Sequence, residues 1–132
     1  MELLLDTCTL LWALFDNKRI SKEVGELLED INNDIYVSAA SLWEIAIKNS
    51  RRPDSMPYSL DEIFNVISNY TDFIILPIKP AHLFALKNVI KQGIHQDPFD
   101  HIMIATSQVE NVRLVTCDTN ILRYQGVELI PY

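Results

Sequence analysis

Short apolar runs alternate along the chain with segments whose apolar residues recur every three to four positions. The short runs are strand candidates, and they cover residues 3–5, 35–37, 73–76, 114–116 and 127–130. The intervening segments have the period of helices, as in the run that contains Val24, Leu27, Leu28 and Ile31. Short, continuously apolar strands separated by helices are typical of a parallel sheet covered on both faces. The pattern therefore predicts an α/β fold.

Serine and proline residues mark where the predicted helices begin. The N-cap candidates are Ser21, Ser38 and Ser59, and the first-turn prolines are Pro80 and Pro98. The helix that opens at Pro80 is expected to stop near Gly93, which is a common helix terminator. The helix after Ser38 is expected to run to Lys48, before a loop over residues 49–58.

Length and composition describe an ordinary globular chain. It has 132 residues, of which 48% are hydrophobic and 22% charged, so residues 1–132 are long enough to bury a core as a single domain. Glu2 stands where an export signal would carry positive charge, and Asp6 interrupts the apolar run. No apolar segment reaches the length of a membrane span. We therefore expect a cytoplasmic protein with no membrane partner.

Acidic residues gather where the predicted strands end. Asp6 follows the first strand and Asp118 follows the fourth. Asp97 and Asp100 open the helix at residue 98, and Glu44 lies in the helix after Ser38. In an open parallel sheet the carboxyl ends of the strands share one edge, and ligands bind there. We therefore expect the acids to share one pocket.

Each acid also has an ordinary structural explanation. Asp6, Asp97 and Asp118 are each placed to cap the helix that follows. Asp100 suits a first helical turn, where the helix dipole favours negative charge. For each acid alone, the structural explanation competes well with a role in binding or catalysis. A shared site is therefore predicted only from the acids taken together.

Glu44 has two structural explanations of its own. It can complete a capping box with Ser41, although this fits poorly if Ser38 is the true N-cap. It can also form an i,i+4 ion pair with Lys48. A carboxylate inside an apolar helix needs a partner, and a metal ion would also satisfy it.

Several carboxylates in one pocket repel one another, so some must be protonated or bound to a cation. An all-oxygen site suits Mg²⁺ or Mn²⁺ better than zinc. Such pockets commonly hydrolyse phosphodiesters, because the metal activates water and neutralises developing charge. The chemistry predicted from the acids is therefore metal-dependent cleavage of a phosphodiester.

The overall charge has the wrong sign for a nucleic-acid partner. The net charge is −7, from 18 acids and 11 bases, whereas most affinity for nucleic acid comes from basic groups that meet phosphates. A bound cation and a local basic patch would have to supply the attraction. Lys48, Arg51 and Arg52 are the candidate patch and possible RNA contacts, and the alternative is a solvated helix end.

Four motifs occur in the order in which one known family carries them. They are Leu5-Asp6-Thr7, the segment from Ser38 to Lys48, His95-Gln96-Asp97-Pro98-Phe99-Asp100, and Thr116-Cys117-Asp118. Together they span residues 5–118. On these motifs the chain resembles the PIN-domain ribonucleases, specifically the VapC-type toxins of bacterial toxin–antitoxin pairs.

This resemblance implies a fold, a site and partners. The fold would be a PIN-like three-layer α/β structure with a five-stranded parallel sheet in the order 3-2-1-4-5, covered by helices on both faces. The activity would be Mg²⁺- or Mn²⁺-dependent endonucleolytic cleavage of RNA, held in check by a small antitoxin, with a homodimer as the usual assembly. The implied site residues are the acids Asp6, Glu44, Asp100 and Asp118, the additional metal-ligand candidate Asp97, and the supporting hydroxyls of Thr7 and Thr116.

The chain departs from the family pattern at two places. Relatives usually carry Arg where this chain has His101, so a permanent charge is replaced by one that titrates near neutrality. His101 is therefore a possible RNA contact, and the alternative is that His95 and His101 are solvated. Relatives also tend to continue the second motif into a Gly-Lys-Leu segment, where this chain has residues 49–53, Asn-Ser-Arg-Arg-Pro.

Other proteins with acidic α/β folds fit less well. A signalling receiver-like domain with an acidic magnesium pocket should end its third strand with Asp, but that strand continues from Leu76 into Pro77. A phosphatase with an aspartyl nucleophile needs a second Asp two residues after Asp6, where Cys8 stands. A non-catalytic binding module on the same fold stays an open alternative.

Overall fold

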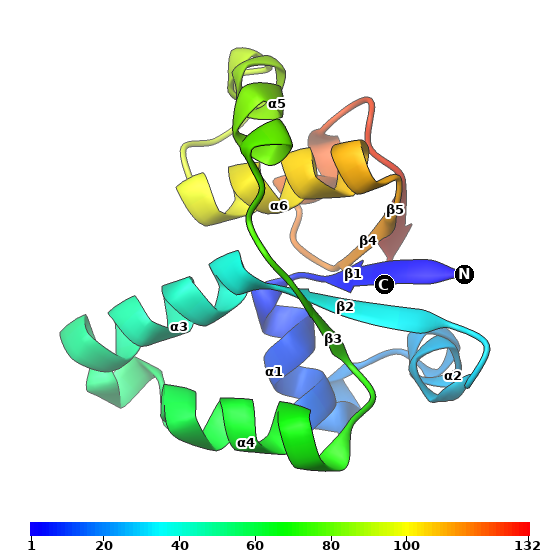
Figure 1. Ribbon diagram of the computed structural model, residues 1–132, viewed down its shortest axis with the longest axis vertical. Helices are drawn as coiled ribbons and strands as arrows, with labels where there is room; N and C mark the ends of the chain where they lie inside the picture. Colours follow the sequence, from blue (N-terminus) through cyan, green and yellow to red (C-terminus); the bar gives the residue numbers. More distant parts are fainter.

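A five-stranded parallel sheet forms the centre of the molecule (Figure 1). The structure is a computed structural model, and it describes residues 1–132. The strands are β1 (Glu2–Leu5), β2 (Asp34–Ser38), β3 (Ile74–Leu76), β4 (Arg113–Thr116) and β5 (Leu129–Pro131). Their order across the sheet is β3-β2-β1-β4-β5, and every neighbouring pair is parallel. The predicted fold class and strand order are confirmed.

Six α-helices cover the two faces of this sheet (Figure 1). Helices α1 to α4 pack on one face, and α5 and α6 pack on the other. Their bounds are α1 (Thr7–Phe15), α2 (Lys22–Glu29), α3 (Ala39–Arg51), α4 (Leu60–Tyr70), α5 (Pro80–Lys91) and α6 (Pro98–Glu110). Three short 3₁₀ turns lie at Asn17–Arg19, Pro53–Ser55 and Ile121–Arg123. No helix is long and apolar enough to cross a bilayer.

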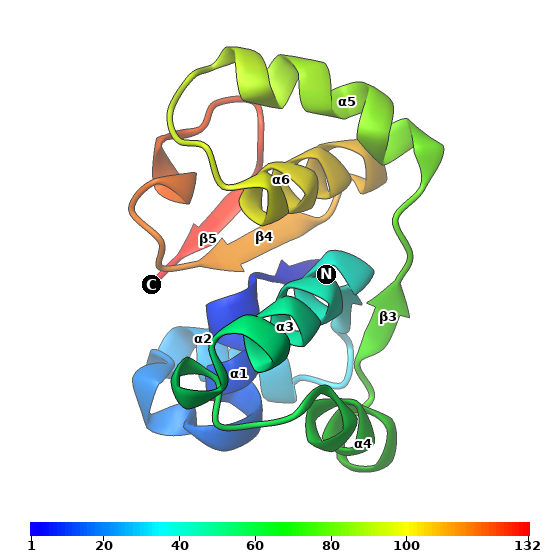
Figure 2. The ribbon, with the colours of Figure 1, turned by 90° about the vertical axis from the view of Figure 1, so that its left-hand side faces the viewer.

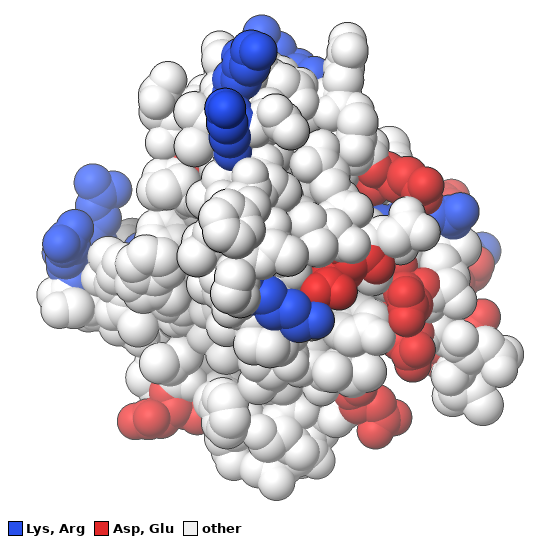
Figure 3. Space-filling model, turned by 45° about the horizontal axis from the view of Figure 1, so that its top comes forward, with Lys and Arg blue, Asp and Glu red and all other residues white.

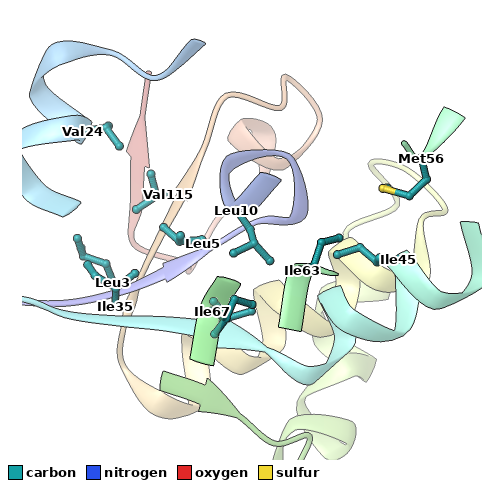
Figure 4. Close-up of a cluster of buried hydrophobic side chains, with 11 residues drawn as sticks. Leu3, Leu5, Leu10, Val24, Ile35, Ile45, Met56, Ile63, Ile67 and Val115 are labelled. Carbon is teal, nitrogen blue, oxygen red and sulfur yellow. The ribbon is translucent and has the colours of Figure 1, made fainter. Parts of the chain in front are cut away.

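Each face of the sheet carries its own hydrophobic core. Because side chains alternate along a strand, Leu3 and Leu5 of β1 point to the face of α1 to α4, and Leu4 points to the face of α5 and α6. Figure 4 shows the first core, where Leu10 of α1 lies between Leu5 of β1 and Ile63 of α4. The central strand is buried on both sides, which explains its unbroken run of leucines.

The predicted helix starts agree with the structure. The hydroxyl of Ser21 accepts a hydrogen bond from the amide of Val24 at 3.3 Å, and that of Ser38 accepts one from Ala40 at 3.0 Å. Ser59 caps α4 in the same way. At the other end of α5, Gly93 has a φ of 65°, the left-handed conformation that ends helices.

Two predicted boundaries are wrong by a few residues. Helix α3 continues to Arg51 instead of ending at Lys48. The side chain of Asn49 is held by hydrogen bonds to the backbone of Tyr58 and Leu60, and the helix stops only before Pro53. The last strand covers Leu129–Pro131 rather than 127–130.

Candidate functional site

The pairing of β1 with β4 sets the position of the first acid. Leu5 lies opposite Val115 in the parallel register, so Asp6 and Thr116 follow side by side. The amide of Asp6 donates to the carbonyl of Val115 at 3.2 Å, and the hydroxyl of Thr116 donates to Asp6 Oδ2. The same hydroxyl accepts from the amide of Asp118 at 3.0 Å. Thr116 therefore links the two acids at the ends of the neighbouring strands.

Asp6 is buried, and its carboxylate caps helix α1. Its side chain is 4% exposed, and its Oδ1 accepts from the amide of Thr9 at 2.8 Å, which caps α1. Burial raises the pKa of Asp6, hydrogen bonds from Thr116 and Thr9 lower it, and the charge of Asp118 raises it again. The helix-capping explanation holds, and the acid still lies within electrostatic reach of Asp118.

Asp97 and Asp100 lie together at the start of α6. Oδ1 of Asp97 accepts from the amides of Phe99 at 2.9 Å and Asp100 at 3.2 Å, so Asp97 is the N-cap. Burial raises the pKa of Asp100 to about 6, with further contributions from the charges of Asp97 and Asp118, while a hydrogen bond from His95 acts in the opposite direction. The acids of β1, β4 and α6 therefore influence one another through their charges.

Three of these acids keep a carboxylate oxygen without a hydrogen bond. Asp118 uses Oδ1 for the amides of Asn120 at 2.8 Å and Ile121 at 3.2 Å, and its Oδ2 has no partner. The same holds for Oδ2 of Asp97 and for Oδ1 of Asp100. These oxygens are available to a ligand even though each acid already caps or supports the local backbone.

Glu44 is satisfied by the protein itself. Its Oε1 accepts from the hydroxyl of Thr7 at 2.7 Å, and its Oε2 pairs with the ammonium group of Lys48 at 2.8 Å. The predicted ion pair with Lys48 is confirmed. The capping box with Ser41 is wrong, because Ser38 is the N-cap and Glu44 therefore lies in the second turn. Thr7, whose hydroxyl was expected to support the site, lies against Glu44 rather than Asp6.

The donor set fits a hard divalent cation by its chemistry. Asp6, Asp100 and Asp118 offer only oxygen atoms, which Mg²⁺ and Mn²⁺ prefer. In the structure, however, no group of three or more His, Cys, Asp or Glu side chains is close enough together to hold a metal ion. Protein donors such as Thr116 and His95 bind the carboxylates instead. The residues of the site are present, and their side chains are not arranged as a closed cage.

The second half of α3 and the start of α6 are on the same side of the molecule (Figure 2), and residues from both line a pocket. Its volume is about 340 Å³, and it is lined by Glu44, Ile47, Lys48, Arg51, Arg52, Asp97, Pro98 and Phe99. Lys48 is paired with Glu44, whereas Arg51 and Arg52 are exposed and form no salt bridge. On the face shown in Figure 3, Lys and Arg side chains lie in separate groups rather than in a continuous stripe. Any attraction for phosphates at this pocket therefore depends on a few cations.

His95 and His101 are not solvated, and that expectation is wrong. His101 is 6% exposed, and its Nε2 lies 2.8 Å from the carbonyl oxygen of His95 and 3.1 Å from the hydroxyl of Tyr124. Its hydrogen-bonding edge points into the protein, so the structure gives no support to a contact between His101 and RNA. His95 bonds Asp100, and sequence reasoning missed both this contact and Tyr124. The signal for His95 was its place in the same motif as Asp100.

Replacement of Asp100 by Asn should change how stability depends on pH. In the folded chain the pKa of Asp100 is about 6, whereas the pKa of an Asp in an unfolded chain is about 3.9. Between these values the folded chain binds more protons, so this group makes the metal-free protein less stable as pH rises. Asp100→Asn should be more stable than the wild type at pH 7 and should gain less on acidification to pH 5.

Denaturant unfolding in EDTA at pH 5, 6 and 7 measures this effect. The control is Asp72→Asn, which changes an exposed acid outside the site and should leave the wild-type pH dependence unchanged. Parallel stability curves for Asp100→Asn and the wild type would contradict the explanation.

Comparison with known proteins places this fold. The family model described as PIN domain matches residues 3–127. Among solved structures, VapBC2 from Rickettsia felis bound to a promoter DNA fragment has a TM-score of 0.73 at 17% identity, over 99% of this chain and 98% of that one. DNA-bound VapBC from Salmonella typhimurium has a TM-score of 0.72 at 13% identity, over 99% and 98%. FitAcB from Neisseria gonorrhoeae has a TM-score of 0.66 at 19% identity, over 97% and 96%.

The search of curated proteins gave no match. Because the identities are low, the likeness to the solved structures shows the fold alone. The family model covers all six helices and, from residue 3 onward, the strands β1 to β4. The chain therefore belongs to the PIN domain family.

Proposed function

We propose that this chain is a divalent-metal-dependent endoribonuclease that hydrolyses RNA phosphodiester bonds. The observation that carries the proposal is the set of acids at one edge of the sheet, where the charge of Asp118 raises the pKa of both Asp6 and Asp100. Repulsion of this kind favours a bound cation. Membership of the PIN domain family supports the same activity class.

The residues that would hold Mg²⁺ or Mn²⁺ are Asp6, Asp100 and Asp118, with Asp97 beside them. The bound ion would supply an activated water and would neutralise charge on the phosphate. Asp6 is held firmly by Thr116 and the end of β4, so it is the fixed member of the set. Asp100 and Asp118 each offer an oxygen without a hydrogen bond, which an ion beside Asp6 would use.

The role of Glu44 in this proposal is indirect. It lines the pocket beside Asp97 and holds the ammonium group of Lys48 at 2.8 Å. Half of the Lys48 side chain stays accessible, at 44% exposure. Glu44 would therefore orient a cation toward the RNA, while Thr7 holds its other oxygen.

Removal of one acid should abolish cleavage without unfolding the protein. Purified protein should cleave RNA with Mg²⁺ or Mn²⁺, and EDTA should stop it. Asp118→Asn keeps an oxygen that can accept from the amides of Asn120 and Ile121, so the turn should survive while the metal site is lost. Asp6→Asn should also be inactive, and its metal-free stability should equal or exceed that of the wild type because repulsion is relieved.

The matched control for this cleavage assay is Asp72→Asn, prepared in the same way, which should cleave at the wild-type rate. Robust cleavage by folded Asp6→Asn or Asp118→Asn would remove the assignment. A large loss of stability in Asp6→Asn would show that helix capping is its main role.

Arg51 and Arg52 are the cations that we assign to the RNA. Both line the pocket between α3 and α6, and neither is neutralised by an acid. We therefore expect the RNA backbone to cross the end of α3 on its way to the acids. This placement explains how a chain of net charge −7 attracts a polyanion at one point of its surface.

The double variant Arg51→Ala/Arg52→Ala should raise KM and leave kcat nearly unchanged, because these groups bind phosphates away from the reacting bond. Its binding should also depend less on salt, by a slope of roughly one for each lost phosphate contact. The control is Lys87→Ala/Lys91→Ala, which removes two exposed cations from α5. Equal effects of the two double variants would show a general charge effect and no local RNA path.

We further propose that a small antitoxin inhibits this chain. The solved structures with the same fold include VapBC, FitAcB and a toxin–antitoxin complex from Klebsiella pneumoniae. A hollow of about 520 Å³ between α3 and α4 offers apolar surface to a helix, and it is lined by Leu42, Leu60, Asp61, Phe64, Asn65, Ser68 and Asn69. A guanidinium group of the inhibitor would bind the carboxylates of Asp6, Asp100 and Asp118 in place of the metal. Assembly of this chain as a homodimer stays a prediction.

Co-expression with the adjacent short reading frame should give a complex that does not cleave RNA. Phe64→Glu introduces a charge into the hollow, where Phe64 is 49% exposed, and should prevent co-purification while cleavage is retained. Replacement of the inhibitor's basic residue should restore cleavage before binding is lost. If the neighbouring product neither binds nor inhibits the wild type, the antitoxin proposal fails and the nuclease proposal remains.

A further inference from the structure

A chain of largely buried hydrogen bonds ends on the carboxylate of Asp100. Nε2 of His95 lies 2.8 Å from Asp100 Oδ2, and Nδ1 of the same ring lies 2.9 Å from the hydroxyl of Tyr124. That hydroxyl lies 3.1 Å from Nε2 of His101, which is also 2.8 Å from the carbonyl oxygen of His95. The His95 and Asp100 side chains are each 14% exposed, and Tyr124 is 4% exposed. None of these contacts is required by the sheet or by helix capping.

The chemistry of the groups fixes the direction of the donors. An ionised carboxylate only accepts, so His95 donates from Nε2 to Asp100. In the neutral ring Nδ1 is then an acceptor, and the hydroxyl of Tyr124 donates to it. The oxygen of Tyr124 accepts in turn from Nε2 of His101, which also donates to the carbonyl of His95. Every donor in the chain therefore points toward Asp100.

This arrangement restrains one oxygen of Asp100 and leaves the other free. Oδ2 is bound by His95, and Oδ1 has no hydrogen bond. A carboxylate held by one oxygen has a fixed plane, so its second oxygen is presented in one direction. Partners of this kind orient metal-binding carboxylates in proteins, and their loss weakens metal binding.

We propose that His95 is a positioning residue for Asp100, and that Tyr124 and His101 hold the ring of His95 in the orientation and tautomer that serve this purpose. The inference rests on the proposed metal-dependent function, because Asp100 is one of its metal-binding acids. In this inference the buried His101 supports Tyr124 and the backbone of His95.

A second histidine–carboxylate pair supplies a comparison inside the same molecule. His82 is fully buried, its Nε2 lies 2.9 Å from Glu110 Oε1, and its Nδ1 accepts from the amide of Lys79 at 3.1 Å. This pair joins the start of α5 to the end of α6, at the opposite end of α6 from Asp100. A purely structural role for His95 predicts that both pairs behave alike when the histidine is replaced.

The experiment measures Mn²⁺ affinity by calorimetry on folded variants, without reference to activity. His95→Phe keeps a ring and removes the donor, and it should weaken Mn²⁺ binding by about 10–100-fold. His95→Gln restores an N–H that can reach Asp100, and it should recover most of the affinity. His82→Phe should lower the melting temperature and leave Mn²⁺ affinity unchanged. If His95→Phe fails to fold, Tyr124→Phe removes only the hydroxyl and should weaken binding in the same direction.

A double-mutant cycle shows whether His95 acts through Asp100. In the Asp100→Asn background, His95→Phe should cause no further loss of Mn²⁺ affinity, because the group that it positions is gone. The same loss in both backgrounds, or unchanged affinity in His95→Phe alone, would overturn the positioning role.

The wild type and Asp118→Asn separate this inference from the proposed function. If the wild type binds Mn²⁺, Asp118→Asn does not, and His95→Phe binds as the wild type does, only the positioning role is wrong. If the wild type binds no Mn²⁺, the proposed function and this inference fall together.

Discussion

The parallel register between β1 and β4 is the constraint on which the site depends. It places Asp6 next to Val115 and Thr116, where the backbone of one strand end and the hydroxyl of the other bind the buried acid. A carboxylate with so little exposure is stable only when its oxygens are hydrogen-bonded. The same threonine accepts from the amide of Asp118, so one strand pair positions two of the acids. The start of α6 then has to supply only Asp97 and Asp100.

Helix capping and metal binding are compatible roles for these acids. Asp6, Asp97 and Asp118 each use one oxygen for backbone amides at the start of a helix or turn, and Asp97 and Asp118 keep the other oxygen free. The exposed amides at helix starts carry partial positive charge, which offsets repulsion between neighbouring carboxylates. A metal-free site can therefore stay folded while its acids remain close together. This explains why the structural explanation of each acid holds when it is considered alone, and why it does not argue against a shared site.

The hydrophobic pattern was sufficient for the sheet, the helices and the edge at which the acids gather, because burial on one or both faces imposes a period on the sequence. It could not show which polar side chains meet. Thr7 reaches Glu44 across 37 positions, and His101 reaches Tyr124 across 23. The end of α3 was missed for the same reason, since Asn49 is anchored by the distant backbone of Tyr58. Such contacts depend on how the packed layers bring loops together, and no local spacing in the sequence records them.

The burial of residue 101 decides which elements can bind the substrate in the proposed function. The two hydrogen-bond partners of His101 are a carbonyl oxygen and a hydroxyl, so neither would offset the permanent charge of an arginine, whereas a histidine N–H suits both. The residue at this place in the present chain therefore supports the loop that carries His95 and does not grip a phosphate. In the proposed function the attraction for RNA therefore comes from elsewhere, and the cations beside the acids that form no salt bridge are those at the end of α3. The proposed function thus assigns substrate binding and metal binding to different elements, which meet at the pocket between α3 and α6.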